Sequence, residues 1–221
     1  MQQRVSIPTL LLWFLVHCTV WIGLILVIAG DDRVDYVDLG SLDTPWVRQF
    51  ILPLLVVLAL QVLLITRLGW WRPVLRDEEP SSRRGRAWIA PAVILLLGFA
   101  RFSEDGFASE TGASFLVGVA VTMFLVGLTE ELSFRGILLV GGRGALGSER
   151  AAFLFSSALF GLFHLPNMFI GAGVAAALFQ VVQTAVVGSA LYSLRRASGG
   201  LLACIALHAV YDFFLVQGAG L

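Results

Sequence analysis

Long apolar runs constrain the fold of this chain more than any other feature. Seven stretches consist almost entirely of apolar residues, and polar segments separate them. Most of them approach the roughly 20 residues that a helix needs to cross a bilayer. They predict an all-α fold, a polytopic membrane helical bundle of about seven transmembrane helices. The stretches are Ile7–Gly30, Phe50–Leu68, Ala87–Ala100, Ala113–Val140, Ala151–Phe169, Gly173–Leu194 and Leu201–Val216.

Composition supports this interpretation and narrows it. The 221-residue chain is 58% hydrophobic and only 14% charged, whereas soluble domains are about 25% charged. The first stretch exceeds the roughly 7–15 residues of a signal-peptide core, so it is expected to remain as a span. The third stretch is short and contains Pro91, so it could instead be a re-entrant segment. We expect a multi-pass protein of the cell membrane (inner or plasma membrane), with the lipid bilayer as a partner.

Net charge and cysteine content exclude other classes of protein. The 15 basic residues balance the 15 acidic ones, so the chain has no broad basic surface and nucleic acid is not an expected partner. Cys18 and Cys204 both lie in apolar stretches. Two isolated cysteines predict neither a disulfide framework nor a cysteine metal site.

Arginine-rich and arginine-poor loops alternate along the chain. The first and third loops are acidic, the fifth has no charge, and the second, fourth and sixth carry arginines. This alternation follows the positive-inside rule and predicts a cytoplasmic N-terminus, provided that all seven stretches cross. The arginines of these three loops are Arg67, Arg72, Arg76, Arg83, Arg84, Arg86, Arg143, Arg150, Arg195 and Arg196.

Three groups of ionisable residues interrupt the apolar stretches, and such groups are costly inside a membrane. In the first, Glu131 and Arg135 have i, i+4 spacing and can pair along one helix face. Glu130 projects about 100° away from Glu131 and lacks an obvious local cation, so it could act as a general base. Alternatively, both glutamates mark a solvated helix end. The position of Glu130, roughly 15 Å before Val140, favours a deep location.

The other two groups contain histidines. His164 lies roughly 20 Å into the fifth stretch, where a lone histidine is more often a hydrogen-bonded packing residue. His208 and Asp212 again have i, i+4 spacing, so the carboxylate could fix the imidazole tautomer, or the pair could simply join two helices. Counted from the same predicted side, the depths of Glu130, His164 and His208 agree to within about 8 Å, so these residues could converge.

Other buried polar residues have simpler explanations. His17 has no polar neighbour at helical spacing in the first stretch, which indicates a structural role. Gln180, Gln183 and Thr184 lie in the sixth stretch, and hydrogen bonds between helices explain them more economically than contact with a substrate.

Taken together, the three ionisable groups resemble motifs of the CPBP family of intramembrane proteases. Glu130 to Arg135 resembles the motif E-E-x-x-x-R, Phe160 to His164 resembles F-x-x-x-H, and His208 to Asp212 resembles H-x-x-x-N/D. The similarity covers approximately Thr122 to Leu215. The family includes type II CAAX prenyl endopeptidases and bacteriocin-processing and immunity proteins.

The resemblance implies an endopeptidase that hydrolyses a bond in a membrane-associated protein or peptide. It implies that Glu130 activates a water molecule and that His164 helps to hold it. His208 and Asp212 would flank the scissile carbonyl and stabilise the oxyanion. An ionised Asp212 cannot donate a hydrogen bond as an asparagine there could, so it would have to be protonated, orient His208 or bind a cation.

The resemblance also implies supporting residues and leaves the cofactor open. Glu131 and Arg135 would form a supporting ion pair, and Phe160 would pack within its motif. The family has been described both as metalloproteases and as metal-independent glutamic proteases. Glu130, His164 and His208 could ligate zinc, but the spacing H-E-x-x-H is absent, so a metal-free mechanism is favoured.

The sequence predicts two parts of the chain and leaves two alternative functions open. Residues 113–221 are expected to form the catalytic membrane core, and residues 1–112 N-terminal transmembrane helices that could gate the substrate. One alternative is a non-catalytic immunity or assembly factor. Another is a proton-coupled transporter that uses the Glu and His residues as a relay, although the internal repeat typical of such proteins is not found.

Overall fold

The computed structural model describes residues 5–30, 45–77, 88–105 and 113–218, and within these ranges the chain is all-α, as predicted. The only β-structure among the described residues is one isolated bridge, between Arg76 and Gly200. The elements are α1 (Ile7–Ala29), α2 (Pro45–Leu68), α3 (Trp71–Leu75), α5 (Ile89–Asp105), α6 (Ala113–Glu131), η3 (Leu132–Leu138), α7 (Leu139–Leu146), α8 (Glu149–Phe163), η4 (Leu165–Phe169), α9 (Val174–Ser198) and α10 (Leu202–Gly218).

The described residues of all seven apolar stretches are mainly helical, and the chain is a multi-pass membrane protein. Within the described ranges, five helical segments are long and apolar enough to cross a membrane. The helix Leu202–Val216 is apolar but shorter, and α5 has 17 residues. The count of seven spans therefore stays a prediction. The five segments are Ile7–Ile28, Gln49–Leu68, Leu116–Leu146, Glu149–Phe169 and Val174–Ser198.

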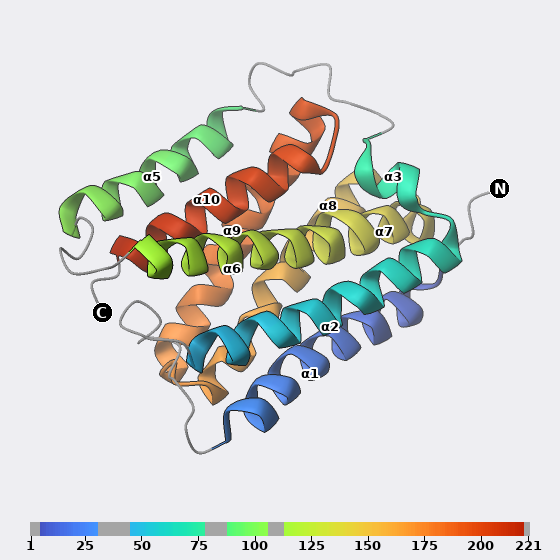
Figure 1. Ribbon diagram of the computed structural model, residues 1–221. Helices are drawn as coiled ribbons and strands as arrows, with labels where there is room; N and C mark the ends of the chain where they lie inside the picture. Colours follow the sequence, from blue (N-terminus) through green and yellow to red (C-terminus); the bar gives the residue numbers. More distant parts are fainter. Residues whose placement is uncertain (1–4, 31–44, 78–87, 106–112, 219–221) are drawn as a thin grey trace.

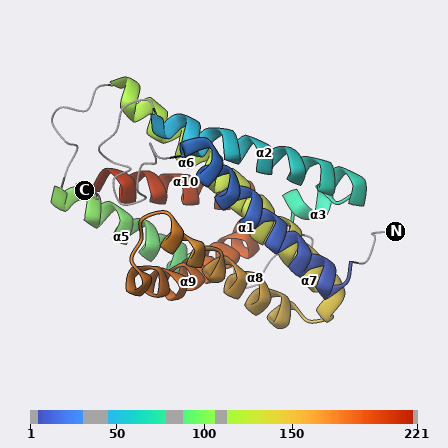
Figure 2. The ribbon, with the colours of Figure 1, turned by 90° about the horizontal axis from the view of Figure 1, so that it is seen from below.

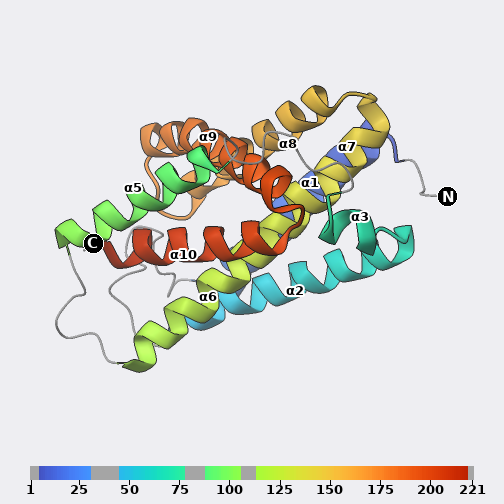
Figure 3. The same ribbon diagram turned by 90° about the horizontal axis from the view of Figure 1, so that it is seen from above.

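The helices form a bundle around one long central segment (Figure 1). This segment runs from α6 through η3 to α7, and α10 packs along α6 on one side. On the other side α1 packs against α2, and α1 crosses the central segment (Figure 2). Helices α8 and α9 form a closely packed pair, and α5 lies against α10 and, less extensively, against α9 (Figure 3). The central segment also packs against α8, so it contacts both of the other motif-bearing helices.

The outer surface of the bundle suits a lipid environment. Large apolar side chains are exposed on α1, α2, α5 and α9, with Val27 80%, Leu96 66% and Phe179 70% exposed. Extended apolar surfaces of this kind mark contact with a membrane or a partner in place of water. The described surface therefore agrees with insertion of the bundle in a bilayer.

Three of the arginine-bearing loops meet at one end of the bundle. Arg143, which follows the fourth stretch, pairs with Asp77 at 3.2 Å and with Glu149 at 2.8 Å. Arg196, after the sixth stretch, pairs with the same two carboxylates at 3.5 and 3.4 Å. The Tyr192 hydroxyl donates to Glu149 at 2.7 Å. The described parts of loops two, four and six therefore lie on one side, as the alternation of charge requires.

Some of the charges used in the topology prediction are not described. Arg83, Arg84 and Arg86, and the acidic residues of the first loop, lie outside the described residues. The orientation of the bundle relative to the cytoplasm stays a prediction.

Arg195 binds the backbone of the second loop from α9. Its guanidinium is fully buried and donates to the carbonyl oxygens of Val74 at 2.7 Å and Pro73 at 2.6 Å. Its Nε lies 3.9 Å from Asp77. One side chain thus satisfies backbone carbonyls near the end of the short helix α3 and fixes that helix against α9.

We expect Arg195→Ala to destabilise the fold far more than the adjacent Arg196→Ala. Loss of a buried, hydrogen-bonded charge partner costs roughly 3–5 kcal/mol. The Arg196 side chain is 17% exposed and makes only long ion pairs, so its loss should cost about 1 kcal/mol or less. Unfolding of the two purified variants in detergent measures the difference, and equal losses of stability would contradict it.

Candidate active site

The two adjacent glutamates lie where the central segment changes its helical geometry. Helix α6 ends at Glu131, and the next seven residues, Leu132–Leu138, form a π-helix. Such wide turns occur frequently at functional sites. Glu130 is 7% exposed and Glu131 is fully buried. Both carboxylates are therefore inside the bundle, and the alternative of a solvated helix end does not hold.

Polar side chains from α1 and α2 hold this junction. The Gln61 amide donates to the carbonyl oxygen of Thr129 at 2.6 Å and to the Ser133 hydroxyl at 2.9 Å. Ser133 also hydrogen-bonds Nδ1 of His17 at 2.9 Å. His17 thus has a packing role, next to the first motif. Sequence reasoning missed Gln61, and the only signal was a glutamine in the middle of an apolar stretch.

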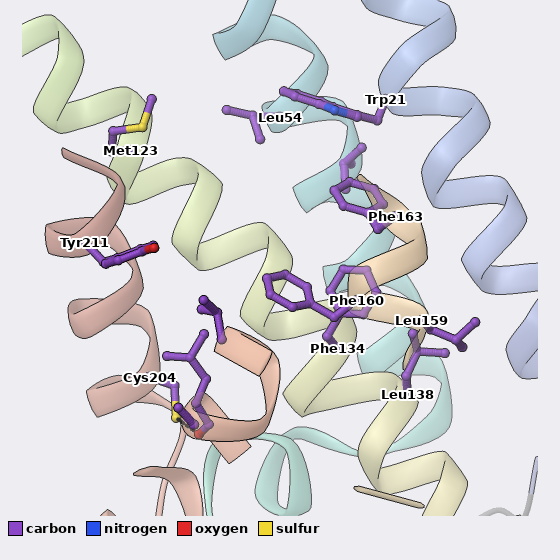
Figure 4. Packing of buried hydrophobic residues seen from close by; sticks show 14 of the residues in the cluster. Trp21, Leu54, Met123, Phe134, Leu138, Leu159, Phe160, Phe163, Cys204 and Tyr211 are labelled. Atoms are coloured by element: carbon purple, nitrogen blue, oxygen red, sulfur yellow. Dashed lines mark hydrogen bonds between the residues drawn. The ribbon is translucent and has the colours of Figure 1, made fainter. Parts of the chain in front are cut away.

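Glu131 and Arg135 form the ion pair that their spacing predicts. Arg135 Nη1 lies 2.8 Å from Glu131 Oε1, and both side chains are inaccessible to solvent. The Arg135 Cζ atom lies 4.0 Å from the centroid of the Phe160 ring, which adds a cation–π contact. The Phe134 ring packs edge-on against both Phe160 and Phe163, and Figure 4 shows the three side chains together. The first motif is thereby joined to the second.

His208 connects the first motif to the third. Its Nδ1 lies 2.9 Å from Glu131 Oε1. Its Nε2 lies 3.3 Å from Asp212 Oδ2 and 3.7 Å from Glu130 Oε2. One ring nitrogen is thus held by the ion-paired glutamate, and the other faces the space between Glu130 and Asp212. Glu131 therefore contacts His208 as well as Arg135, which sequence reasoning did not foresee.

His164 lies where α8 gives way to the 3₁₀-helix η4. Its Nδ1 is 2.9 Å from the carbonyl oxygen of Phe160. A carbonyl can only accept, so Nδ1 carries a hydrogen and Nε2 is the acceptor of a neutral ring. The Phe160 and Phe163 rings meet the imidazole edge-on. The bond from Nδ1 to the Phe160 carbonyl fixes the tautomer whose Nε2 can accept a hydrogen bond from water.

A single cavity brings these side chains together. It encloses about 140 Å³, and Glu130, His164, His208 and Asp212 all line it. One water molecule in the liquid occupies about 30 Å³, so the cavity has room for water beside Glu130. The convergence that the sequence could only suggest is present in the structure. The remaining lining residues are Trp21, Phe50, Val119, Thr122, Met123, Val126, Phe160, Phe163, Asn167, Gln180, Gln183, Thr184, Val187, Tyr211, Leu215 and Val216.

Three glycines allow the motif-bearing helices to approach closely. A Cβ atom at Gly127 would lie 3.1 Å from the Ile205 carbonyl oxygen of α10, and one at Gly161 would lie 2.5 Å from the Val181 carbonyl oxygen of α9. A Cβ atom at Gly188 would lie 3.0 Å from Arg135 Nη2. Small residues serve this purpose in membrane helices. No local pattern indicates that Gly127 and Gly161 lie at close helix contacts.

Among the described residues, no three His, Cys, Asp or Glu side chains lie close enough together to hold a metal ion. Nδ1 of His208 bonds a carboxylate and Nδ1 of His164 bonds a backbone carbonyl, as the second ring nitrogen of a metal-ligating histidine commonly does. Glu130, His164 and His208 share a cavity, and a metal-free site stays a prediction.

Comparison with known proteins agrees with the class of protein that this site indicates, a membrane-embedded protease. The family model described as type II CAAX prenyl endopeptidase Rce1-like matches residues 112–214. This range contains all three motifs, and the match supports a CPBP-family intramembrane protease of the CAAX endopeptidase type. Neither the curated proteins nor the solved structures contain a match to the chain.

We expect Gly161→Ala to impair both stability and proteolysis. The new methyl group would meet the backbone of α9, which cannot move aside as a flexible side chain can, so α8 and α9 must separate and displace His164. Gly144→Ala is the matched control, because a Cβ atom there meets nothing within 4 Å. Thermal unfolding in detergent and a cleavage assay would compare the two, and a fully stable, active Gly161→Ala variant would contradict the close packing.

Proposed function

We propose that this chain hydrolyses a peptide bond in a membrane-anchored protein or peptide, using a water molecule that Glu130 activates. The observation that carries the proposal is the shared cavity of Glu130, His164, His208 and Asp212. It joins a carboxylate, two imidazoles and space for water inside an apolar bundle. A protein of the cell membrane with this site would act on substrates embedded in the same bilayer.

Glu130 is the general base in this proposal. Its Oε2 atom is buried and has no hydrogen-bond partner among the described residues, so it is available to accept a proton. His164 would accept the second hydrogen of the same water at Nε2. The water oxygen attacks the carbonyl carbon, its proton passes to Glu130, and Glu130 then gives that proton to the leaving amine. The carboxylate is regenerated when the carbon–nitrogen bond breaks.

His208 stabilises the oxyanion. Arg135 holds Glu131, and Glu131 accepts a hydrogen bond from Nδ1 of His208, so the ring cannot turn freely. When Nε2 also carries a proton, it can donate to the oxygen that becomes negative in the tetrahedral intermediate. Before the reaction, the Nε2–H of this doubly protonated ring would donate to Asp212 Oδ2, 3.3 Å away, so the carboxylate orients the ring. This role suits an aspartate, which does not need to donate.

The substrate class follows from the family and from the membrane location. Type II CAAX endopeptidases give the family its name, so a prenylated C-terminal peptide is one candidate. A leader peptide, or a C-terminal sorting tail anchored in the membrane, has the same chemistry at the scissile bond. Because Glu130 can supply the base and a protonated His208 can supply the positive charge, we propose that no metal takes part.

We expect Glu130→Gln to abolish cleavage while the protein stays folded, because an amide cannot take a proton from water. Protein termini in membranes of the native host would be mapped quantitatively at equal expression of wild type and variant. Defined termini should disappear in the variant, and the lost termini identify the substrates. Glu149→Gln, which alters a carboxylate at the far end of the bundle, should leave the map unchanged.

Coincident maps of wild type and Glu130→Gln would contradict the proposed protease. Thermal unfolding of both proteins in detergent separates loss of chemistry from loss of fold. A non-catalytic immunity or assembly factor would keep its cellular phenotype in the Glu130→Gln variant.

We expect purified protein to keep its cleavage rate after treatment with a strong zinc chelator and dialysis into metal-free buffer. In the proposed mechanism the positive charge comes from His208, and no metal is required. The cleavage of a synthetic peptide spanning a mapped site measures the rate. Loss of activity that added zinc restores would overturn the metal-free mechanism and leave the protease assignment in place.

A further inference from the structure

The cavity has two chemically different walls. The wall formed by α6 and the distal part of α10 is largely apolar and includes Val119, Met123 and Leu215. The wall formed by η4 and α9 carries carboxamide and hydroxyl groups, and we call it the amide wall. It consists of Asn167, Gln180, Gln183 and Thr184. None of these four residues belongs to the three catalytic motifs.

The amide wall follows one face of α9. Gln180, Gln183, Thr184 and Val187 have the spacing i, i+3, i+4, i+7, so they form one stripe along the helix, and all four line the cavity. Val182 lies on a different face and is 66% exposed. The polar stripe is therefore a property of the cavity side of α9, and the lipid-facing side stays apolar.

The stripe begins at the catalytic centre. One residue beyond Val187, Gly188 lies against the Arg135 guanidinium and the Phe160 ring. From Gly188 to Gln180 the helix rises by about 12 Å, which equals the length of about four residues of an extended peptide. Gln183 is exposed at the rim. A peptide lying along the stripe would thus reach from the enclosed cavity to the bundle surface.

Hydrogen bonds between elements account for only part of this arrangement. The Asn167 amide donates to Gln180 Oε1 at 2.9 Å, the Thr184 hydroxyl donates to the Gln180 carbonyl at 2.7 Å, and the Gln183 side chain hydrogen-bonds Tyr211 of α10. A glutamine carboxamide has two N–H donors and a carbonyl acceptor, so the bond from Gln183 to Tyr211 leaves capacity for a ligand at an exposed position beside the cavity.

Binding of an extended peptide would explain the polar groups of the amide wall. Unwinding a substrate helix inside a membrane exposes backbone N–H and C=O groups that must find partners. Carboxamides provide both donors and acceptors, and they bind a backbone without regard to the side chains. The apolar wall opposite would contact the substrate side chains.

We propose that the amide wall binds the backbone of the substrate in extended form on one side of the scissile bond. It would accept an apolar segment of about four residues that has been unwound from the membrane. This inference rests on the proposed function and adds the conformation and the polarity of the substrate.

The test uses full-length purified protein and a synthetic peptide spanning a cleavage site from the terminus map. A series of analogues carries one backbone N-methyl group at each of the four residues on either side of the scissile bond. The variants are Gln183→Leu, which removes the amide, Gln183→Asn, which restores one, and Val182→Leu, a control on the lipid-facing side of the same helix.

We expect Gln183→Leu to raise KM about five- to tenfold and to leave kcat within about twofold. This change corresponds to the loss of one hydrogen bond to the substrate backbone. Gln183→Asn should recover part of the loss, and Val182→Leu should behave as wild type. One N-methyl group should raise KM of the wild type by a similar factor and add little in Gln183→Leu, because both changes remove the same bond.

Two results would overturn this inference alone. In the first, N-methylation at every position raises KM by the same factor in Gln183→Leu as in the wild type, so the two effects on KM multiply. In the other, Gln183→Leu lowers thermal stability without changing KM, which would mean that the glutamine only joins helices. Thr184→Val provides a second variant if Gln183→Leu does not fold. If Glu130→Gln alters no termini, the proposed function itself fails, and that result is read before any peptide is made.

Discussion

The buried contact of Arg135 with Glu131 and of Glu131 with His208 is the interaction on which the rest of the structure depends. A guanidinium and a carboxylate with no access to solvent are costly to bury, and removing either would leave the other uncompensated. The pair is therefore stable only where neighbouring groups complete it. The Phe160 ring covers the guanidinium, and His208 takes a second contact with the carboxylate. Three helices must meet at one point for this to occur, and these are the helices that carry the motifs.

The N-terminal helices take part in the same construction. Gln61 of α2 and His17 of α1 bond the junction between α6 and the π-helix, immediately beside Glu130 and Glu131. The division into an N-terminal part and a catalytic core stays a prediction, but the first two helices have a definite task, which is to hold the motif helix. A gate formed by residues 1–112 would have to leave these contacts in place or exchange them when it opens.

Much of the fold could be predicted from the sequence, because lipid imposes simple rules. The described residues of all seven apolar stretches are mainly helical, and the i, i+4 spacing correctly paired Glu131 with Arg135 and His208 with Asp212. The π-helix could not be predicted, since Leu132–Leu138 has ordinary helical composition and its geometry depends on contacts from other helices. The partner of His208 at Nδ1 was missed for the same reason: Glu131 is 77 residues away in the chain. The close approach at Gly161 depends on a carbonyl of α9, which no local pattern reveals.

Two clusters of charged residues show that the same types of side chain can have different roles. In the network at the end of the bundle, Glu149 accepts from Arg143, Arg196 and Tyr192, and Asp77 contacts three arginines. Its carboxylates are occupied, as a structural network requires. In the cavity, Oε2 of Glu130 and Oε2 of Glu131 are buried without a hydrogen-bond partner among the described residues. A buried acceptor left without a bond costs stability. This difference in bonding, more than the presence of charge inside the membrane, distinguishes the cavity cluster from the network at the end of the bundle, and it is what the proposed role of Glu130 as a proton acceptor requires.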